Sequence, residues 1–491
     1  MFSDKDKKTM LVYTGLALLF VYPLIQAGIF YRDDLDRSIT GQYGWRGLGR
    51  PVADILMKIL SASGHSNLDL FPYTLIASCL FIAGSSFALS NYLKQRNVSH
   101  AVAISALLIF NPYLLQNIAY RYDSLGMSVA FFLAVISYTY RHQHLILQTA
   151  VKLIAGILCL TLYQPCANIF IGLLAIDIAV IAVKQTSTLK SSVRLIAQNT
   201  LLFIAFYLFY TLIFSPKNNA RAELIPLNER GLEHLAMTLN ALKDLVFAYF
   251  HQPVYLYFLV PATIAFMVMF FSFYTQKQKI ISFIIYSAIS LLIFLVSLMG
   301  PTIFLQDAPV YPRTLVSFSV IMVIIAIPLM QFAPRLKYAA FIPVIASLAF
   351  SAQLASALTS QQDYEEFVFN MIAQDLANFN DIDSIGTVGQ LDLGQRTKLL
   401  AENKPLINDF LEPAHDFLSS FQLINKGFPQ TRHGYGEEQD KRNQLMSMIS
   451  EGVKPVTSNK YYSLFISDST AMVLLGNEAI GSQERVLIPA Q

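Results

Sequence analysis

Long apolar stretches separated by short polar segments fill the first 358 residues of the chain. Most of these stretches reach the roughly 17 to 25 residues that a helix needs to cross the hydrocarbon core of a bilayer. The pattern therefore predicts an α-helical polytopic membrane protein with about 11 transmembrane helices. The predicted spans are residues 10–30, 70–93, 101–119, 125–140, 145–162, 167–183, 195–214, 254–274, 280–299, 314–332 and 338–358.

Polar residues become frequent after Leu358. The elements predicted there are a helix over residues 363–379 and strands over 384–388, 461–466 and 471–475. The polar stretch 430–443 is expected to be a mobile loop. We therefore divide the chain into a transmembrane domain, residues 1–358, and a small α/β domain, residues 359–491, which has an ordinary size for one domain.

Two loops between predicted spans are long, residues 31–69 and 215–253. From Pro51 onward apolar residues recur at helical spacing, which predicts a short amphipathic helix lying on the membrane. A second amphipathic helix is predicted over residues 229–250. Loops of this length commonly carry function, and the second is expected either to cover a cavity or to lie on the membrane surface.

Composition supports membrane insertion, because 54% of the residues are hydrophobic and only 14% are charged. The mean hydropathy is +0.48, which a water-soluble chain of this length does not normally need. The three cysteines, Cys79, Cys159 and Cys166, all lie in or beside apolar stretches. They indicate no disulfide framework.

The distribution of charge predicts the orientation in the membrane. The net charge of +3 combines +11 over residues 1–358 with −8 over residues 359–491. Basic residues gather in alternate short segments, which the positive-inside rule places in the cytoplasm. Because topology accounts for the excess of basic residues, a nucleic-acid partner is not expected. These residues are Lys5, Lys7, Lys8, Lys94, Arg96, Arg141, Lys184, Lys190, Arg194, Lys277, Lys279, Arg335 and Lys337. The N-terminus is then cytoplasmic, and the α/β domain lies on the outer side.

Arginines also occur in the outer loops, where the positive-inside rule disfavours them unless they have partners. The candidates are Arg32, Arg50, Arg121 and Arg313. Pairing with neighbouring acids is one explanation. Binding of an anionic ligand is the other, because guanidinium offers two parallel donors that match a phosphate. Both explanations stay open at this level.

Asp33 and Asp34 follow directly on the first predicted span, where a helix should meet water. A carboxylate at such a place suits a general base that activates a hydroxyl group. Adjacent residues of an extended segment face opposite ways, so only one of the pair is expected to be the base. No set of side chains has metal-ligand spacing, and no cofactor is expected, although an ion bridged by Asp33 and Asp34 remains an alternative.

Other polar residues in the outer loops are candidates for contacting a sugar or an acceptor. They are Trp45, Tyr120, Tyr122, Asp123, Gln164 and His251. Each also has a structural interpretation: Trp45 as an interfacial anchor, Gln164 as part of a turn, and His251 as a contact to lipid headgroups. Asp177 lies inside a predicted span and is expected to make a structural hydrogen bond.

The order of an apolar span, Asp33-Asp34, a loop with Trp45 and Gly49-Arg50-Pro51, and a juxtamembrane helix resembles the phage-type, serotype-converting O-antigen glucosyltransferases, membrane enzymes of the GT-C class. The resemblance extends over residues 30–125, including Asn111-Pro112 and Tyr120 to Ser124, and more weakly to residue 358.

The resemblance implies a GT-C-like fold in the bacterial inner membrane and an inverting transfer at its periplasmic face. The implied donor is undecaprenyl-phosphate-linked glucose, and the implied acceptor is lipid-linked O-antigen. It places the catalytic carboxylate at Asp33 or Asp34.

A transporter or flippase of lipid-linked sugar is the main alternative. Such a protein should place polar groups near the bilayer midplane and often shows repeated halves with broken helices. Here the charges gather at the outer ends of the predicted spans, which favours chemistry at one surface. A third interpretation, a membrane anchor that presents the C-terminal domain for binding, gives no role to the aspartate pair.

Overall fold

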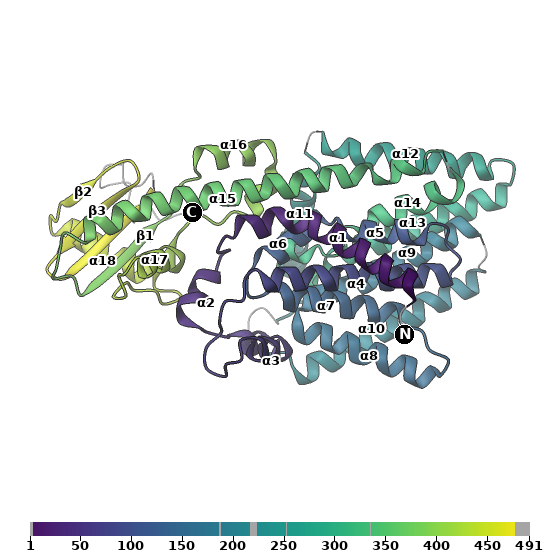
Figure 1. The fold of residues 1–491 in the computed structure, drawn as a ribbon, viewed down its shortest axis with the longest axis horizontal. Helices are drawn as coiled ribbons and strands as arrows, with labels where there is room; N and C mark the ends of the chain where they lie inside the picture. The colour runs from purple at the N-terminus through teal and green to yellow at the C-terminus, as the bar shows by residue number, and fades with distance from the viewer. Residues whose placement is uncertain (1–2, 186–187, 217–222, 252, 334, 477–491) are drawn as a thin grey trace. The chain divides into compact units, whose positions relative to one another are not determined.

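A computed structural model describes residues 3–185, 188–216, 223–251, 253–333 and 335–476. Contacts between residues divide the chain into two compact units (Figure 1). The helical unit contains residues 1–28, 43–64 and 69–353, and the α/β unit contains residues 29–42, 65–68 and 354–491. Residues 29–42, which carry Asp33 and Asp34, thus belong with the C-terminal part of the chain.

The helical unit is built from long apolar helices. They are α1 (Asp4–Ala27), α4 (Tyr73–Gln95), α7 (Ser124–Thr139), α8 (Leu145–Leu162), α9 (Asn168–Lys184), α10 (Leu189–Ile213), α12 (Val254–Phe273), α13 (Lys277–Met299), α14 (Val320–Phe332) and the first part of α15 (Ile342–Leu376). Within the described ranges, eight helical segments are long and apolar enough to cross a membrane, or nine when one bent pair is counted as a span. The chain is therefore a mostly helical protein with several potential membrane spans.

Three of the predicted spans differ from straight crossing helices. Residues 101–119 form two short helical segments that bend by 42° around Asn111-Pro112, and α14 is shorter than the span predicted for it. Helix α7 has the predicted length of 16 residues, which is short for a crossing helix. Proline lacks a backbone N–H and cannot continue the helical hydrogen-bond ladder. The Asn111 side chain instead donates to the carbonyls of Leu315 and Val316, at 3.0 and 2.9 Å. This pairing fixes a turn before α14, which begins only at Val320.

The segments around this bend are α5 (Ala101–Ala106), η2 (Leu107–Ile109), η3 (Pro112–Leu114) and α6 (Leu115–Ala119). The short segments that connect the long helices on the predicted outer side are η1 (Trp45–Leu48), α3 (Pro51–Leu60), η4 (Gln164–Ala167), α11 (Glu229–Tyr249), η6 (Gly300–Phe304) and η7 (Pro312–Thr314). The helices predicted from Pro51 and from Glu229 are both confirmed.

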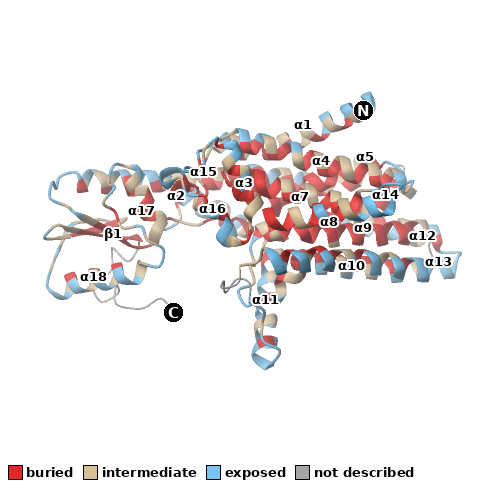
Figure 2. Ribbon diagram, turned by 90° about the horizontal axis from the view of Figure 1, so that it is seen from below, coloured by how far each residue is buried: buried red, intermediate tan, exposed pale blue. Residues whose placement is uncertain are grey.

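Helix α9 forms the interior of the helical unit, and Figure 2 shows it almost wholly buried beside the more exposed α10 and α13. Its Asp177 is fully buried and accepts hydrogen bonds from the hydroxyls of Tyr92 on α4 and Tyr138 on α7, both at 2.6 Å. Arg96 pairs with the same oxygen at 3.0 Å. Asp177 therefore makes the structural hydrogen bonds expected of it, and these bonds join α9 to α4 and α7.

The α/β unit has a four-stranded sheet in the order β1-β4-β3-β2. Its strands are β1 (Ser384–Gly389), β2 (Pro455–Ser458), β3 (Tyr462–Ser467) and β4 (Thr470–Leu475). Strand β1 pairs with β4 in parallel, and the other pairs are antiparallel. Three of the strands lie where the sequence predicts them, whereas β2 was not predicted.

Helices cover both faces of this sheet. The C-terminal part of α15 packs on one face through Val368, Phe369 and Ile372, and α18 packs on the other through Leu445 and Met448. The remaining helices are α2 (Asp34–Thr40), α16 (Gln395–Asn403), η9 (Pro405–Asp409), α17 (Asp416–Asn425) and α18 (Glu438–Ser450). The helix predicted over residues 363–379 is thus the continuation of the last long helix.

The prediction of a mobile loop over residues 430–443 is wrong in its second half, because α18 begins at Glu438. Lys441 on this helix is fully buried and pairs with Asp416 at 3.0 Å. A buried lysine requires such a partner. Because Asp416 lies 25 residues away in sequence, the pairing could not be seen locally. The polar residues alone therefore suggested a solvated loop.

Candidate active site

The aspartate pair lies at the start of α2 in the α/β unit. Arg32, just before it, has a φ of 52°, a left-handed conformation that is uncommon for a residue with a side chain. Asp34 is the first residue of the helix, and its Oδ2 accepts a hydrogen bond from the backbone N–H of Tyr31 at 3.0 Å. Asp34 is fully buried. The expected extended segment is therefore a tight turn into a helix, closed by the Asp34 carboxylate.

Asp33 has different surroundings. Its Oδ2 lies 3.1 Å from Nη2 of Arg37, one turn further along α2, and its side chain is 32% exposed. The same oxygen accepts from Nε of Arg37 at 3.2 Å. An accessible carboxylate held by a guanidinium is oriented and still able to meet a substrate. Of the two aspartates, Asp33 is the accessible one, and it lines neither of the pockets described below.

Arg32 pairs with Glu412 at 2.9 Å, a residue of the C-terminal part of the chain. Its Nε also donates to the hydroxyl of Tyr31 at 3.3 Å. Arg32 therefore fits the first of the two explanations for arginines in the outer loops, which is pairing with an acid.

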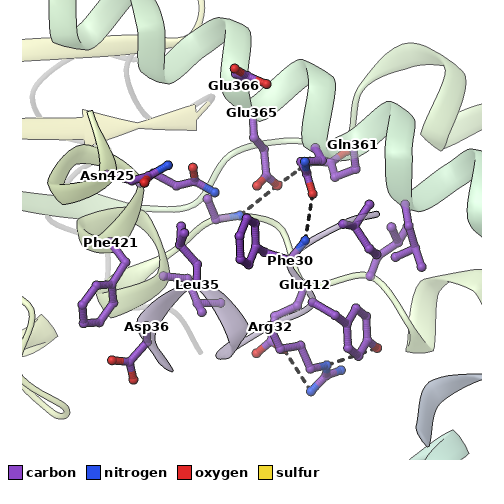
Figure 3. Close-up of a pocket in the computed structure, with 18 of the residues that line it drawn as sticks. Phe30, Arg32, Leu35, Asp36, Gln361, Glu365, Glu366, Glu412, Phe421 and Asn425 are labelled. Atoms are coloured by element: carbon purple, nitrogen blue, oxygen red, sulfur yellow. Dashed lines mark hydrogen bonds and ion pairs between the residues drawn. The ribbon is translucent and has the colours of Figure 1, made fainter. Parts of the chain in front are cut away.

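Both Arg32 and Glu412 line a pocket of about 290 Å³ in the α/β unit. Figure 3 shows its walls: the segment around Phe30 to Asp36, the α15 residues Gln361 to Glu366, and α17 with Asn425. Four carboxyl groups line it, against two basic groups, Arg32 and Lys426. A pocket with this excess of acid repels a phosphate, so it suits a neutral, polyhydroxylated ligand better.

Glu365 is a buried carboxyl group of this pocket, beyond Leu358, where the apolar part of α15 ends. Its Oε1 accepts from Nε2 of Gln361 at 2.9 Å and from the backbone N–H of Ala414 at 3.1 Å. Burial raises the pKa of Glu365 to about 7, although both hydrogen bonds oppose the shift. Its carboxyl group consequently changes protonation near neutral pH.

Asp36 also borders the pocket, and its oxygens are engaged. Oδ2 accepts from Nε2 of Gln42 at 2.5 Å and from the hydroxyl of Tyr435 at 2.6 Å. Burial, together with this contact, raises the pKa of Tyr435. Tyr435 therefore acts as a hydrogen-bond donor that ties the loop before α18 to α2.

A second pocket, of about 420 Å³, lies in the helical unit. Its lining comes from the connecting residues 48–50, 163–165, 224 and 302–314, and from residues 207–216 at the C-terminal end of α10 and just after it. Their convergence brings together two arginines that the sequence singled out, Arg50 and Arg313, with one carboxylate, Asp307. The pocket is thus basic, the opposite of the pocket in the α/β unit. We call it the arginine pocket.

Arg50 is held in this pocket by Gln164. Nε of Arg50 donates to Oε1 of Gln164 at 2.9 Å, and its guanidinium carbon lies 4.7 Å from the ring centre of Tyr163. Nε2 of Gln164 donates to the hydroxyl of Tyr210 at 2.7 Å and to the carbonyl of Leu48 at 3.0 Å. Gln164 therefore does more than form a turn, because its side chain fixes the position of the Arg50 guanidinium.

Arg313, on η7, lines the same pocket. Its Nη1 donates to the hydroxyl of Tyr120, and its guanidinium carbon lies 4.9 Å from the ring centre of Tyr311. The backbone N–H of Arg313 donates to Oε1 of Gln116 at 2.9 Å. Tyr120 is buried, so its position supports Arg313 and does not present a ring to a sugar.

The remaining candidates serve other contacts. Arg121 pairs with Asp69 at 2.8 Å, donates to the carbonyl of Gly28, and is only 11% exposed. Trp45 is 1% exposed and donates its indole N–H to Asp123 at 2.6 Å. Neither sugar stacking nor interfacial anchoring agrees with this burial of Trp45. Tyr122 is buried, and His251 is exposed after the end of α11. Eight candidates line neither pocket: Asp33, Asp34, Trp45, Tyr120, Arg121, Tyr122, Asp123 and His251.

Comparison with known proteins identifies a family for this chain. The family described as Glucosyl transferase GtrII matches residues 22–330, which include the aspartate pair and the whole arginine pocket. The chain belongs to this family. A curated relative, the "Uncharacterized 55.3 kDa protein in gtrB 5'region" of Salmonella phage P22, is 29% identical over 199 residues. That match covers 40% of this chain and 40% of the relative.

Several residues of the two pockets were not singled out from the sequence. Tyr210 and Glu412 carry no local signal, because Gln164 and Arg32, their respective partners, lie 46 and 380 residues away. Glu365 lies in a segment whose sequence predicts an ordinary polar helix. Asp307 was not named as a site candidate either. Its occurrence in a Pro-rich loop between two predicted spans was the one available signal.

Proposed function

We propose that this member of the family is an inverting glucosyltransferase that moves glucose from undecaprenyl phosphate to lipid-linked O-antigen at the periplasmic membrane face. The observation that carries the proposal is the arginine pocket, where several outer connections and the end of α10 bring two guanidinium groups to one basic cavity. Family membership supports the transfer of glucose. A phage-encoded relative supports a role in changing the surface glycan of the host.

The arginine pocket is the proposed site of the donor phosphate. When the bond between the sugar and the phosphate breaks, negative charge grows on the departing lipid phosphate. Preorganised cations stabilise such charge most strongly in a site that excludes water. The guanidinium groups of Arg50 and Arg313 donate hydrogen bonds to Gln164 and Tyr120, so little reorganisation is needed when the charge develops.

Asp33 is the proposed general base. The acceptor hydroxyl attacks C1 of the glucose, its proton passes to the Asp33 carboxylate, and the phosphate leaves with the electrons of the broken C1–O bond. Attack opposite the leaving group inverts the configuration at C1. Asp34 is proposed to shape the turn, because its carboxylate is buried against the backbone of Tyr31. The step needs no cofactor, because the donor carries its own leaving group.

The acidic pocket of the α/β unit is proposed to bind the acceptor glycan. Its lining combines carboxyl and amide groups with aromatic rings such as Phe421. Carboxyl and amide groups bind sugar hydroxyls, and apolar rings pack against sugar C–H faces. Its wall includes Arg32, the residue before Asp33. Binding here would bring the glycan to the segment that carries the proposed base.

The proposed location is the bacterial inner membrane, with the N-terminus in the cytoplasm and the α/β unit in the periplasm. The loop charges support this orientation. Most of the lining of the arginine pocket comes from connections that the charge pattern assigns to the outer side, and the rest comes from the end of α10 that precedes the outer loop 215–253.

Purified protein in proteoliposomes tests the proposal. Undecaprenyl-phosphate glucose and lipid-linked O-antigen are supplied on the side of the α/β unit, and the glycan is analysed by mass spectrometry. The expected product is O-antigen carrying an additional hexose with inverted anomeric configuration. Movement of the lipid-linked sugar across the bilayer without covalent transfer would replace the proposal with a flippase.

A further inference from the structure

An apolar groove of about 660 Å³ lies at the start of α11 in the helical unit. Its walls come from residues 224–235 and from Pro301 and Phe304 of η6. Asn228 is the one polar side chain among the lining residues of this described groove, and its Oδ1 is used to cap α11 by accepting from the N–H of Gly231 at 3.1 Å. The groove therefore offers an almost wholly apolar surface.

The first turn of α11 is built closely against the preceding loop. A Cβ atom at Gly231 would lie 1.8 Å from the carbonyl oxygen of Pro226, so no other residue fits there without a shift of the backbone. This contact holds the start of α11 against the loop. Leu232, one residue further, is 69% exposed although it lines the groove.

A short antiparallel ladder separates the groove from the arginine pocket. The N–H of Ile225 donates to the carbonyl of Phe304 at 2.9 Å, and the N–H of Gln306 donates to the carbonyl of Glu223 at 2.8 Å. Successive side chains of an extended segment point to opposite faces. Phe304 accordingly lines the groove, Leu305 lines the arginine pocket, and Leu224 borders both. The two cavities are neighbours across one pair of extended segments.

We propose that the groove binds the isoprenoid tail of the lipid-phosphate donor while the arginine pocket binds its phosphate. This inference rests on the proposed function and adds a second part to the donor site. A polyprenyl phosphate is a long hydrocarbon joined to one anionic group. A basic pocket that adjoins an apolar groove at Leu224 matches this combination. An ordinary bilayer lipid would fill the groove without needing the adjoining pocket.

If the groove binds the isoprenoid tail, changes in the groove should weaken the binding of a long-tailed polyprenyl phosphate and leave the binding of a short-tailed one unchanged. Purified protein in nanodiscs is tested for binding of undecaprenyl phosphate and of neryl phosphate, which has the same head and a short tail. The groove variants are Leu232→Gln and Leu235→Gln, both at positions that tolerate a polar side chain on an exposed helix. Met237→Gln is the matched control, because Met237 lies on the same helix, is 62% exposed, and does not line the groove.

Each groove variant should weaken binding of undecaprenyl phosphate about fivefold, the effect of losing part of one buried leucine contact. Binding of neryl phosphate should not change, and Met237→Gln should behave as the unmodified protein. Unchanged binding of undecaprenyl phosphate would overturn the proposal, as would equal weakening of both lipids or an equal effect of Met237→Gln. Lipid binding requires no glucosyl transfer, so a protein that fails the transfer assay overturns the proposed function and still gives a result for the groove.

Discussion

The indole nitrogen of Trp45 lies 2.6 Å from a carboxylate oxygen of Asp123, so it joins the first outer loop to the start of α7. Trp45→Phe keeps most of the buried ring and loses this donor. A hydrogen bond to a charged group contributes about 1.5 to 3 kcal/mol. We expect Trp45→Phe to lower the thermal unfolding midpoint of the purified protein, and Asp123→Asn, which keeps the accepting oxygen, to lower it less. Equal midpoints for Trp45→Phe and the unmodified protein would contradict this role.

The aspartate pair should separate into a chemical and a structural residue. Asp33→Asn keeps the size of the side chain and cannot take up a proton, so single-turnover transfer should fall about 100-fold or more while the donor still binds. Asp34→Asn should mainly reduce expression and thermal stability, because its carboxylate closes the turn at Tyr31. Donor binding, transfer rate and expression are measured for both. Full transfer activity in Asp33→Asn would move the base elsewhere, with Asp307 of the arginine pocket tested next.

Arg313 and Arg121 should respond differently to the same conservative change. Lysine keeps the charge and loses the two parallel donors of guanidinium. Arg313→Lys should raise the KM for the lipid-phosphate donor about tenfold, the effect of losing one charge-assisted hydrogen bond. Arg121→Lys should leave this KM unchanged and lower thermal stability, because Arg121 is paired with Asp69. A raised donor KM in Arg121→Lys would return Arg121 to the donor site.

Glu365 should make stability depend on pH. Its pKa is raised to about 7 in the folded protein, against about 4.3 in an unfolded chain, so the folded state holds the proton more tightly. Stability then falls as pH rises from about 4 to about 7 and levels off above that. Glu365→Gln keeps the accepting oxygen and mimics the protonated acid. We expect it to raise the unfolding midpoint at pH 8 relative to the unmodified protein.

The neighbouring Glu366 provides the control, because it is exposed on the same helix. Glu366→Gln should leave the pH profile of the unfolding midpoint as it is. A Glu365→Gln protein that keeps the original decline between pH 4 and 7 would show that another group is responsible.

The orientation can be tested by labelling single cysteines with an impermeant reagent. Ser38 and Ser458 are exposed in the α/β unit, and Gln278 is exposed between Lys277 and Lys279. Cysteines at the first two positions should react from the periplasmic side, and one at 278 should not. The native cysteines are all buried, which keeps the background low. The reverse labelling pattern would invert the proposed topology.

Sequence patterns located most of the long helices because hydrophobicity is a local property of the chain. The bend at Asn111 was not foreseen, since its amide bonds carbonyls about 200 residues further along. Helix α18 was missed because its buried face includes Lys441, whose partner Asp416 comes from another element. Residue types indicated Arg50, Gln164 and Arg313 as site candidates, but only the fold groups them in one pocket. Trp45 and Arg121 were chosen for chemistry that their buried, paired positions do not support.

The junction at Asp177 has a consequence for biogenesis. A carboxylate entering a bilayer alone is costly, and α9 carries one in the middle of a highly apolar segment. Its donors, Tyr92, Arg96 and Tyr138, belong to segments that the ribosome makes earlier. When α9 leaves the translocon, the hydrogen-bond donors for Asp177 are therefore already in the membrane. A chain that lacked α4 and Arg96 would have to insert the Asp177 carboxylate without a positive partner.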